Sequence, residues 1–207
     1  MIIENYWDNY YSKKKYQTQS NFAEFIALHY FEKDKLQLCD IGCGNGRDSI
    51  YFHSKGVEVT GVDLAKDEID YLNKSYPKID FVCADISNLN TNKKYDIIYS
   101  RFSLHSIDKE KEKNLLIWIS NSLLHNGLVC IECRGLKNEL YGKGLKIEGE
   151  EHIYFYEDHY RRFIDYEKLI TELNHLGFII EYSEESTGFS PTKLEDQTFI
   201  RIIARLN

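Results

Sequence analysis

Short apolar runs of strand length alternate with polar stretches of helical periodicity over most of this chain. In the stretch 109–124, Leu115, Leu116, Ile119 and Leu123 recur at helical spacing and form one apolar face. Strands that alternate with helices in this way are typical of a mainly parallel sheet covered by helices. The expected strands are 36–41, 57–63, 79–86, 95–100 and 128–133, and the expected helices are 20–31, 47–55, 66–75 and 109–124.

The last third of the chain departs from this alternation. Residues 135–165 are rich in glycine, tyrosine and charge and show no clean period. An irregular stretch of that length in a compact domain usually forms a lid or a binding loop, so we expect it to cover a substrate. A helix at 166–175 then ends before Gly177, and the apolar runs 178–182 and 198–204 predict two more strands.

Size and composition predict one α/β domain over residues 1–207, with an N-terminal extension at 1–35. No apolar run reaches the roughly 20 residues that span a bilayer, and the N-terminus lacks the basic and apolar regions of a signal peptide. We therefore expect a cytoplasmic protein without membrane contact. A net charge of −7 argues against a nucleic-acid surface, which needs a concentrated basic face, and favours small-molecule partners.

The five cysteines are expected to be free thiols, because most of them fall in or beside predicted strands, where cysteine is usually a small buried apolar residue. Cys130 and Cys133 have C-x-x-C spacing, yet they lie inside a predicted strand without a second pair of ligands at zinc spacing. We therefore expect no metal site.

The turn after the first strand carries the most specific signal. Residues 36–48 read LQLCDIGCGNGRD, with glycines at alternate positions 42, 44 and 46. Glycine is needed where the chain reverses with positive φ or lies against a ligand. In the G-x-G-x-x-G turn of NAD-binding proteins the last glycine would fall on position 47, which is Arg47. This departure argues against an NAD-dependent oxidoreductase.

Two further predicted strands end in a carboxylate. Asp63 arrives about 20 residues after the glycines, where a carboxylate can accept hydrogen bonds from both hydroxyls of a ribose. Taken alone, an aspartate there is more often a helix N-cap. Asp85 closes the third strand, and taken alone it would more often form an Asx turn.

The order of these elements resembles the class I S-adenosylmethionine-dependent methyltransferases from about residue 36 to the C-terminus. The turn beginning at Asp40 is similar to their D/E-x-G-x-G-x-G signature. The resemblance implies an α/β fold with a Rossmann-like, mostly parallel sheet of seven strands, helices on both faces and a closing C-terminal antiparallel hairpin. It implies S-adenosylmethionine as cofactor, with S-adenosylhomocysteine as product.

The same resemblance implies roles for single residues. Asp40 suits the ammonium of the cofactor, Asp63 its ribose, and Asp85 with the backbone at Ile86 its adenine. Tyr11 is a candidate to stack near the sulfonium, if the aromatic N-terminus folds over the site as a flap; a hydrophobic clasp or dimer contact is an equal alternative. The expected cofactor-binding residues are Tyr11, Asp40, Gly42, Cys43, Gly44, Asn45, Arg47, Asp48, Asp63, Leu64, Asp85, Ile86, Ser100 and Arg101.

Candidate catalytic and acceptor-binding residues follow the fourth strand and lie in the predicted lid. His105 could take a proton from an attacking hydroxyl, or it could be a buried histidine bonded to backbone. His159 is the second candidate base. Four arginines could bind an anionic acceptor, although nearby acidic residues could equally neutralise those in the lid. The arginines are Arg101, Arg134, Arg161 and Arg162.

These residues predict methyl transfer to a small-molecule acceptor. O-methylation of an anionic or sugar-like metabolite is the first expectation, because the glycine turn resembles that of small bacterial enzymes that include ones from surface-polysaccharide pathways. A capsule precursor is therefore one possible acceptor. The alternatives are a small-molecule N-methyltransferase and a non-catalytic S-adenosylmethionine-binding sensor or partner protein, and the protein is expected to be a monomer or homodimer.

Overall fold

A sheet of seven strands forms the centre of the molecule. The computed structural model describes residues 18–31, 35–89, 91–149, 151–157, 159–191 and 196–207. The strand order is β3-β2-β1-β4-β5-β10-β9, in which β10 runs antiparallel to both of its neighbours and the other pairs are parallel. The expected Rossmann-like α/β sheet with a closing hairpin is confirmed. Its strands are β1 (Gln37–Ile41), β2 (Glu58–Asp63), β3 (Asp80–Cys83), β4 (Tyr95–Arg101), β5 (Leu123–Cys133), β9 (Phe178–Ser186) and β10 (Phe199–Leu206).

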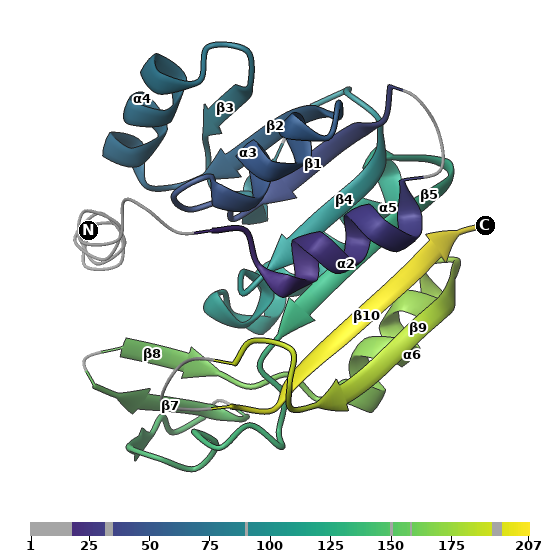
Figure 1. Cartoon of the computed structure of the whole chain (residues 1–207). Coiled ribbons are helices and arrows are strands. Elements are labelled where there is room, and N and C mark those ends of the chain that lie inside the picture. The colour runs from purple at the N-terminus through teal and green to yellow at the C-terminus, as the bar shows by residue number, and fades with distance from the viewer. Residues whose placement is uncertain (1–17, 32–34, 90, 150, 158, 192–195) are drawn as a thin grey trace.

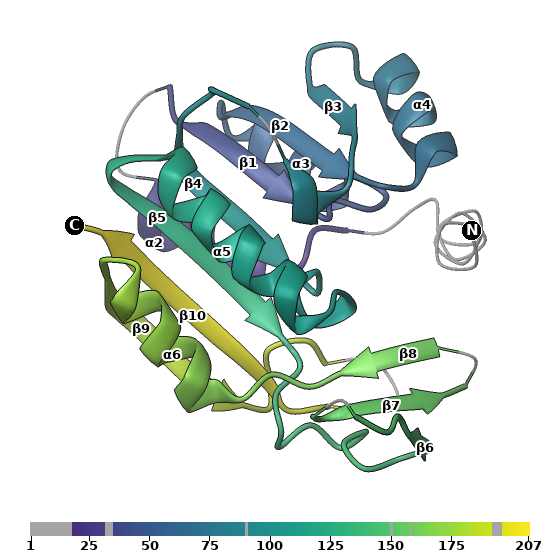
Figure 2. The same cartoon turned by 180° about the vertical axis from the view of Figure 1, so that it is seen from behind.

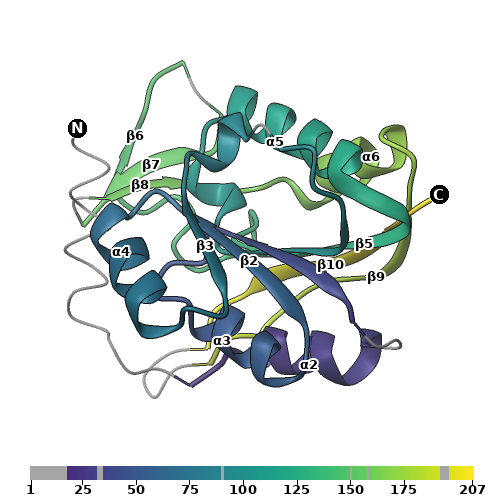
Figure 3. The ribbon, with the colours of Figure 1, turned by 90° about the horizontal axis from the view of Figure 1, so that it is seen from above.

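Helices cover both faces of this sheet (Figures 1 and 2). Figure 3, seen from above, shows α2 and α3 on one side and α5 and α6 on the other. Three of the helices begin at a side-chain cap, where Ser20, Asp108 or Asp165 accepts a hydrogen bond from a backbone N–H of the first turn. The helices are α2 (Asn21–Tyr30), α3 (Arg47–Ser54), α4 (Lys66–Ser75), α5 (Lys109–Ser122) and α6 (Tyr166–His175).

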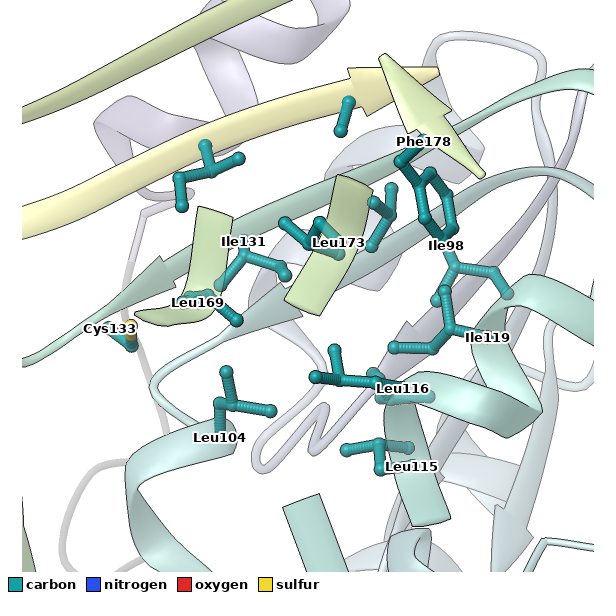
Figure 4. Packing of buried hydrophobic residues seen from close by; sticks show 14 of the residues in the cluster. Ile98, Leu104, Leu115, Leu116, Ile119, Ile131, Cys133, Leu169, Leu173 and Phe178 are labelled. Atoms are coloured by element: carbon teal, nitrogen blue, oxygen red, sulfur yellow. The ribbon is translucent and has the colours of Figure 1, made fainter. Parts of the chain in front are cut away.

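Each face of the sheet has its own hydrophobic core. On the α5–α6 side, Leu116 and Ile119 of α5 and Leu173 of α6 pack with Ile98 and Ile131 of the central strands (Figure 4). On the other side, aromatic residues of α2 and α3 pack against β1 and β4. The central strands are therefore buried on both faces, which explains why they read as nearly continuous apolar runs.

The expected irregular lid at 135–165 is instead partly ordered as a second, three-stranded antiparallel sheet. This small sheet lies beyond the ends of β4 and β5 (Figures 1 and 2). Its aromatic and β-branched residues favour extended backbone, but strands of two to four residues are too short to show a period in sequence. The strands are β6 (Leu145–Lys146), β7 (Ile153–Tyr156) and β8 (His159–Arg162).

Two other expectations change only slightly. β5 begins at Leu123, five residues before the expected start at 128, and α5 ends at Ser122.

Of the expected N-terminal flap over 1–35, residues 1–17 lie outside the described part of the chain, and the described remainder consists mainly of α2. None of the described helices has the length and apolar character needed to cross a membrane.

Candidate functional site

The candidate site lies at the carboxyl ends of β1, β2, β4 and β5, where ligands of open α/β sheets bind. The glycine turn joins β1 to α3 at this edge, and the backbone N–H groups of Gly42 and Cys43 donate to the carbonyl of Val62, at 2.8 and 3.0 Å. Its glycines have left-handed backbones, with φ of +74° at Gly42, +53° at Gly44 and +71° at Gly46. The turn is thus held against the end of β2.

A second contact fixes the same turn against β4. A Cβ atom added at Gly42 would lie 2.1 Å from Oγ of Ser103. That hydroxyl donates to the carbonyl of Ile41 at 2.7 Å, so it cannot move away without losing a buried hydrogen bond. Glycine is therefore required at position 42 both by its φ and by the closeness of Ser103.

Asp63, at the end of β2, is tied to the glycine turn. Its Oδ2 accepts from the N–H of Gly44 at 2.8 Å, and its Oδ1 accepts from the N–H of Ala65, the N-cap residue of α4, at 2.9 Å. The side chain thus helps to begin a helix and also positions a carboxylate beside the turn. Asp63 is not the N-cap that its residue type alone suggested, because Ala65 occupies that position; a contact of Asp63 with ribose hydroxyls stays a prediction.

Asp40 is a buried carboxylate in an acidic neighbourhood. It is 2 % exposed and accepts a hydrogen bond from Oγ of Ser49 at 2.6 Å. Burial, and then the charge of Asp48, raise the pKa of Asp40 to about 7, and Asp63 acts in the same direction. A cation bound beside Asp40 would therefore be favoured by several carboxylates together.

Asp48 has a different role from the one expected. Its Oδ1 accepts from the backbone N–H of Ser20 at 2.7 Å, and its Oδ2 accepts from the hydroxyls of Ser20 and Tyr99, at 2.7 and 2.9 Å. The carboxylate thus joins the start of α2 to α3 and β4 inside the protein. Arg47 lies beside it, with Nε 3.8 Å from Oδ1. The structure therefore gives Asp48 a bridging role within the chain, where cofactor contact was expected.

Asp85 forms the tight turn that its residue type favours. Its Oδ1 accepts from the backbone N–H and the hydroxyl of Ser87, at 2.8 and 2.7 Å, while Oδ2 lies 4.0 Å from Nζ of Lys111. Ile86 follows Asp85 in the chain and is buried. Nearby, the thiol of Cys83 donates to the carbonyl of Leu64 at 3.7 Å. Asn45 is half-buried in the glycine turn. These residues lie at the edge where the adenine end of a nucleoside was expected.

The end of β4 carries a buried charge network that sequence reasoning missed. Arg101 donates through Nε to Glu132 at 2.9 Å and through Nη2 to Ser190 at 2.7 Å. Arg201 of β10 binds the other oxygen of Glu132 at 2.5 and 3.1 Å, so two guanidiniums share one fully buried carboxylate. Ser100, one residue before Arg101, has a buried hydroxyl without a hydrogen-bond partner in the described part of the chain.

Phe102 connects this network to the next residues of the site. Its backbone is left-handed, with φ of +61°, which is strained for an aromatic residue and is a feature often found at functional sites. The guanidinium carbon of Arg101 lies 4.0 Å from the ring centroid, and that of Arg134 lies 5.9 Å away on the same ring. The ring centroids of Phe199 and His105 are 4.8 and 5.7 Å from it.

His105 is buried, with 8 % of its surface exposed, and its Nδ1 accepts a hydrogen bond from the backbone N–H of Arg134 at 3.1 Å. This is the backbone-bonded arrangement considered as an alternative to catalysis. The guanidinium of Arg134 donates to Asn138 at 3.1 Å and to Gln197 at 2.5 Å. Arg134 thus reaches from β5 to the loop before β10.

Arg162 lies deep inside the protein. It is 5 % exposed, donates to the carbonyls of Ile107 and Leu104 at 2.6 and 2.7 Å, and pairs with the buried Glu112. Since its guanidinium binds the segment that carries His105, Arg162 organises the site and does not line it. The expectation that it binds substrate is not supported by this geometry.

The remaining candidates are less fully defined. Arg161 lies 3.6 Å from Glu157, and its Nε is buried without a hydrogen-bond partner in the described part of the chain. The backbone of His159 belongs to β8, but its side chain lies outside the described residues, as does all of Tyr11.

Cys130 and Cys133 are buried free thiols whose pKa values are raised by burial. In the described residues, no three His, Cys, Asp or Glu side chains group to hold a metal ion.

Comparison with known sequences finds methyltransferases among the proteins that this chain is similar to. Residues 38–127 match the family described as "Methyltransferase domain". A putative methyltransferase 235L of Invertebrate iridescent virus 6 is 38 % identical over 97 residues, 43 % of this chain and 36 % of that protein. A ubiquinone biosynthesis O-methyltransferase of Rickettsia typhi is 31 % identical over 128 residues, 58 % of this chain and 50 % of that protein. The chain thus spans half or less of the length of these curated relatives.

Solved structures share the fold at low identity. A SAM-dependent methyltransferase of Methanosarcina mazei has a TM-score of 0.76 and 19 % identity, covering 86 % of this chain and 96 % of that chain. The 1,6-didemethyltoxoflavin-N1-methyltransferase of Burkholderia thailandensis, solved with S-adenosylhomocysteine, has a TM-score of 0.67 and 22 % identity over 90 % and 76 % of the two chains. The [4+2]-cyclase SpnF has a TM-score of 0.74 and 13 % identity over 99 % and 94 % of the two chains. The fold alone therefore leaves the reaction open.

Proposed function

We propose that this chain is a class I S-adenosylmethionine-dependent methyltransferase that methylates an oxygen of a small anionic acceptor. The observation that carries this proposal is the pairing of two unlike regions at one sheet edge. Buried carboxylates surround the glycine turn, whereas guanidiniums outnumber carboxylates in the network at the end of β4. The first region suits a cationic cofactor, and the second suits an acceptor of negative charge.

The residues of the first region fit S-adenosylmethionine. Asp40 would accept from the ammonium. The positive charge of that group would offset the burial and the neighbouring carboxylates that raise the pKa of Asp40 in the free protein. Asp63 would accept from the ribose hydroxyls, and Asp85 with the backbone at Ile86 would bind the adenine. Once bound, the cofactor supplies a methyl group already activated by a positively charged sulfur. The protein therefore has mainly to position the acceptor and exclude water.

The residues of the second region supply donors for an acceptor. Arg101 and Arg134 lie on the ring of Phe102, and Arg134 reaches across the acceptor end of the sheet. Arg161 of the small sheet adds a buried guanidinium nitrogen with an unused hydrogen. An Arg fork binds carboxylate or phosphate bidentately, so acidic metabolites and sugar phosphates are the favoured acceptors. Precursors of surface polysaccharides belong to this chemical class.

The test is methyl transfer from labelled S-adenosylmethionine to matched acceptors that differ only in bearing a hydroxyl, carboxylate, phosphate or amine. Turnover confined to the carboxylate and phosphate members is expected, and Arg134→Gln and Arg161→Gln should each raise KM for them by about tenfold. Arg205→Gln is the matched control, because Arg205 pairs with Glu181 at the opposite end of β10. Equal turnover of neutral acceptors would refute the anionic acceptor, and turnover of amines alone would indicate N-methylation.

A further inference from the structure

The helix that follows the glycine turn begins at a residue without a side chain to cap it. Gly46 is the N-cap residue of α3, and its backbone is left-handed, with φ of +71°. A Cβ atom at this position would lie 2.8 Å from a methyl carbon of the buried Leu72. Both facts disfavour a serine or aspartate there, although these are the usual caps. The start of α3 therefore depends on contacts from other elements.

Two neighbouring side chains in the first turn of α3 make these contacts. Asp48, which is buried, accepts from the N–H and the hydroxyl of Ser20, both at 2.7 Å, and from the hydroxyl of Tyr99 at 2.9 Å. Ser49 donates to Oδ2 of Asp40 at 2.6 Å. The first turn of α3 is thus held by α2 and β4 on one side. On the other side it is bonded to the carboxylate that we expect to meet the ammonium of the cofactor.

Ser20 takes part in the starts of both helices. Its hydroxyl donates to Asp48 and accepts from the N–H of Ala23 at 3.0 Å, which makes it the N-cap of α2. Its oxygen also lies 3.1 Å from the hydroxyl oxygen of Tyr99. Because the residue is buried, water does not readily replace these bonds if the hydroxyl is removed.

Helix α2 is itself fixed against the sheet, so it can hold another element. The rings of Phe22 and Tyr99 are 5.0 Å apart. The guanidinium carbon of Arg201 lies 4.6 Å from the ring centroid of Phe22 and 5.3 Å from that of Phe25. Figure 3 shows α2 and α3 on the same side of the sheet. The start of α2 therefore cannot shift with α3 without disturbing a packed aromatic layer.

We infer that Ser20 is a positioning residue of the cofactor site, because through Asp48 it holds the start of the helix that follows the glycine turn. The inference rests on the proposed binding of the cofactor at that turn, and it does not depend on the acceptor. Ser20 lies outside residues 38–127, so the family match does not indicate it. Without its hydroxyl, the first turn of α3 is expected to shift relative to Asp40.

The first experiment measures the affinity of the full chain for S-adenosylhomocysteine by titration calorimetry. Ser20→Ala removes the hydroxyl but keeps the backbone N–H that also bonds Asp48, and we expect it to raise Kd by about tenfold. Ser20→Thr restores a hydroxyl that can cap α2, and it should bring Kd to within about twofold of the wild-type value. An unchanged Kd in Ser20→Ala, or an equal loss in both variants, would contradict the positioning role.

The matched control removes a helix cap on the other side of the sheet. Asp165 caps α6 by accepting from the N–H of Lys168 at 3.2 Å. Asp165→Ala should lower Tm by an amount similar to that for Ser20→Ala, because each variant loses one cap, but it should leave Kd unchanged. If it weakens binding as much as Ser20→Ala does, general loss of stability explains the effect and the inference is wrong.

The second experiment observes the turn directly, without a ligand. Backbone amide signals of ¹⁵N-labelled glycine are compared between the wild-type chain, Ser20→Ala and Asp165→Ala. We expect the signals of Gly44 and Gly46 to shift or broaden in Ser20→Ala alone. Gly142 provides an internal reference, because it lies in the segment before β6 and a Cβ added there would meet nothing within 4 Å. Unchanged turn signals in Ser20→Ala would overturn the inference.

The outcomes separate this inference from the proposed function. If the wild-type chain does not bind S-adenosylhomocysteine, the proposed function fails, whereas the glycine signals still decide whether Ser20 holds the turn. If the wild-type chain and Ser20→Ala bind it equally well, the proposed cofactor site stands and the positioning role of Ser20 is wrong.

Discussion

Two buried carboxylates at the candidate site have opposite surroundings. Asp40 and Glu132 are both carboxylates at the same sheet edge, with 2 % and 0 % of their surfaces exposed. They differ in their partners, because Asp40 has a hydroxyl and other carboxylates around it, whereas Glu132 has two guanidiniums. In the described part of the chain Asp40 has no ion pair, although the charge of Arg101 acts on it, whereas Glu132 has two ion pairs. This difference leads to opposite predictions for the two residues.

The Asp40→Asn variant is expected to gain stability and lose ligand affinity. The ligand-free protein keeps the proton on Asp40 up to about pH 7, whereas the unfolded chain releases it near pH 4. Stability therefore falls as the pH rises from about 4 to 7, and the whole penalty is present above pH 7. Replacing the carboxyl by an amide removes that penalty, so thermal unfolding should show a larger gain in Tm at pH 8 than at pH 5.

Binding should respond to pH in the opposite sense. A ligand ammonium favours ionised Asp40, so the affinity for S-adenosylhomocysteine should rise by up to about tenfold per pH unit below pH 7 and level off above it. Titration calorimetry from pH 5.5 to 8 measures this, and in Asp40→Asn the dependence should be lost and binding weakened. A flat profile in the wild-type chain would show that Asp40 does not meet a cation in the complex.

Glu132→Gln is expected to destabilise the protein strongly. It leaves Arg101 and Arg201 buried beside a neutral amide, and removing one partner of a buried ion pair costs about 3–5 kcal/mol. Glu181→Gln breaks a pair with Arg205 in which both side chains are about a third exposed, and it should cost less than about 1 kcal/mol. Urea unfolding of the two variants gives the comparison, and similar losses would show that the buried network contributes little.

At the residue scale the sequence locates side chains that follow a predicted strand, but not those that pair across the sheet. Asp40 and Asp63 could be placed because each ends an apolar run. The Glu132–Arg201 pair joins residues 69 positions apart on antiparallel strands, and nothing in the local pattern indicates it. The left-handed backbone of Phe102 was equally hidden, since an aromatic residue rarely adopts positive φ.

At the scale of elements, the glycine turn can be tested by a matched pair of substitutions. Gly42 and Gly56 both have positive φ, of +74° and +86°, so an alanine at either position costs about 1–2 kcal/mol of backbone strain. Only at Gly42 does the added Cβ meet another group, Oγ of Ser103; at Gly56 nothing lies within 4 Å. The turn should therefore tolerate the second change and not the first.

We expect Gly56→Ala to retain the wild-type affinity for S-adenosylhomocysteine and Gly42→Ala to weaken it by at least about tenfold. The extra loss arises because Ser103 must move and give up its bond to Ile41, which shifts the turn against β4. Calorimetry on the folded variants measures the affinity, and circular dichroism checks the fold. Equal affinities in the two variants would mean that the closeness of turn and β4 is unimportant for binding.

The element pattern explains which parts of the fold were predictable. The helices at 66–75 and 166–175 agree with the structure residue for residue, because each has a clear apolar stripe. The start of β5 and the small sheet of β6, β7 and β8 were missed, since exposed residues at 124–126 and strands of two to four residues carry no apolar period. The attachment of that sheet through Arg162 depends on tertiary contacts alone.

At the scale of the whole molecule, the central strands belong to both hydrophobic cores. β1 and β4 contribute residues to the cluster under α5 and α6 and to the cluster under α2, α3 and α4. Unfolding of one layer would therefore expose the faces of strands that the other layer needs. A ligand that binds where these strands end is expected to stabilise both layers together, in a single cooperative transition.

Thermal unfolding with competing ligands tests the site and the superfamily chemistry together. At a concentration of 100 Kd, S-adenosylhomocysteine should stabilise the native chain by about 2.7 kcal/mol, which for a chain of this size raises Tm by roughly 5–10 °C in one transition. NAD should give no shift, because Arg47 stands where its turn needs a third glycine and the buried carboxylates of the site would repel its pyrophosphate. Asp63→Asn should reduce the shift, since it removes the carboxylate beside the glycine turn. A shift with NAD comparable to that with S-adenosylhomocysteine would contradict the assignment of the site, and a second transition that the ligand leaves unmoved would show that the two layers unfold separately.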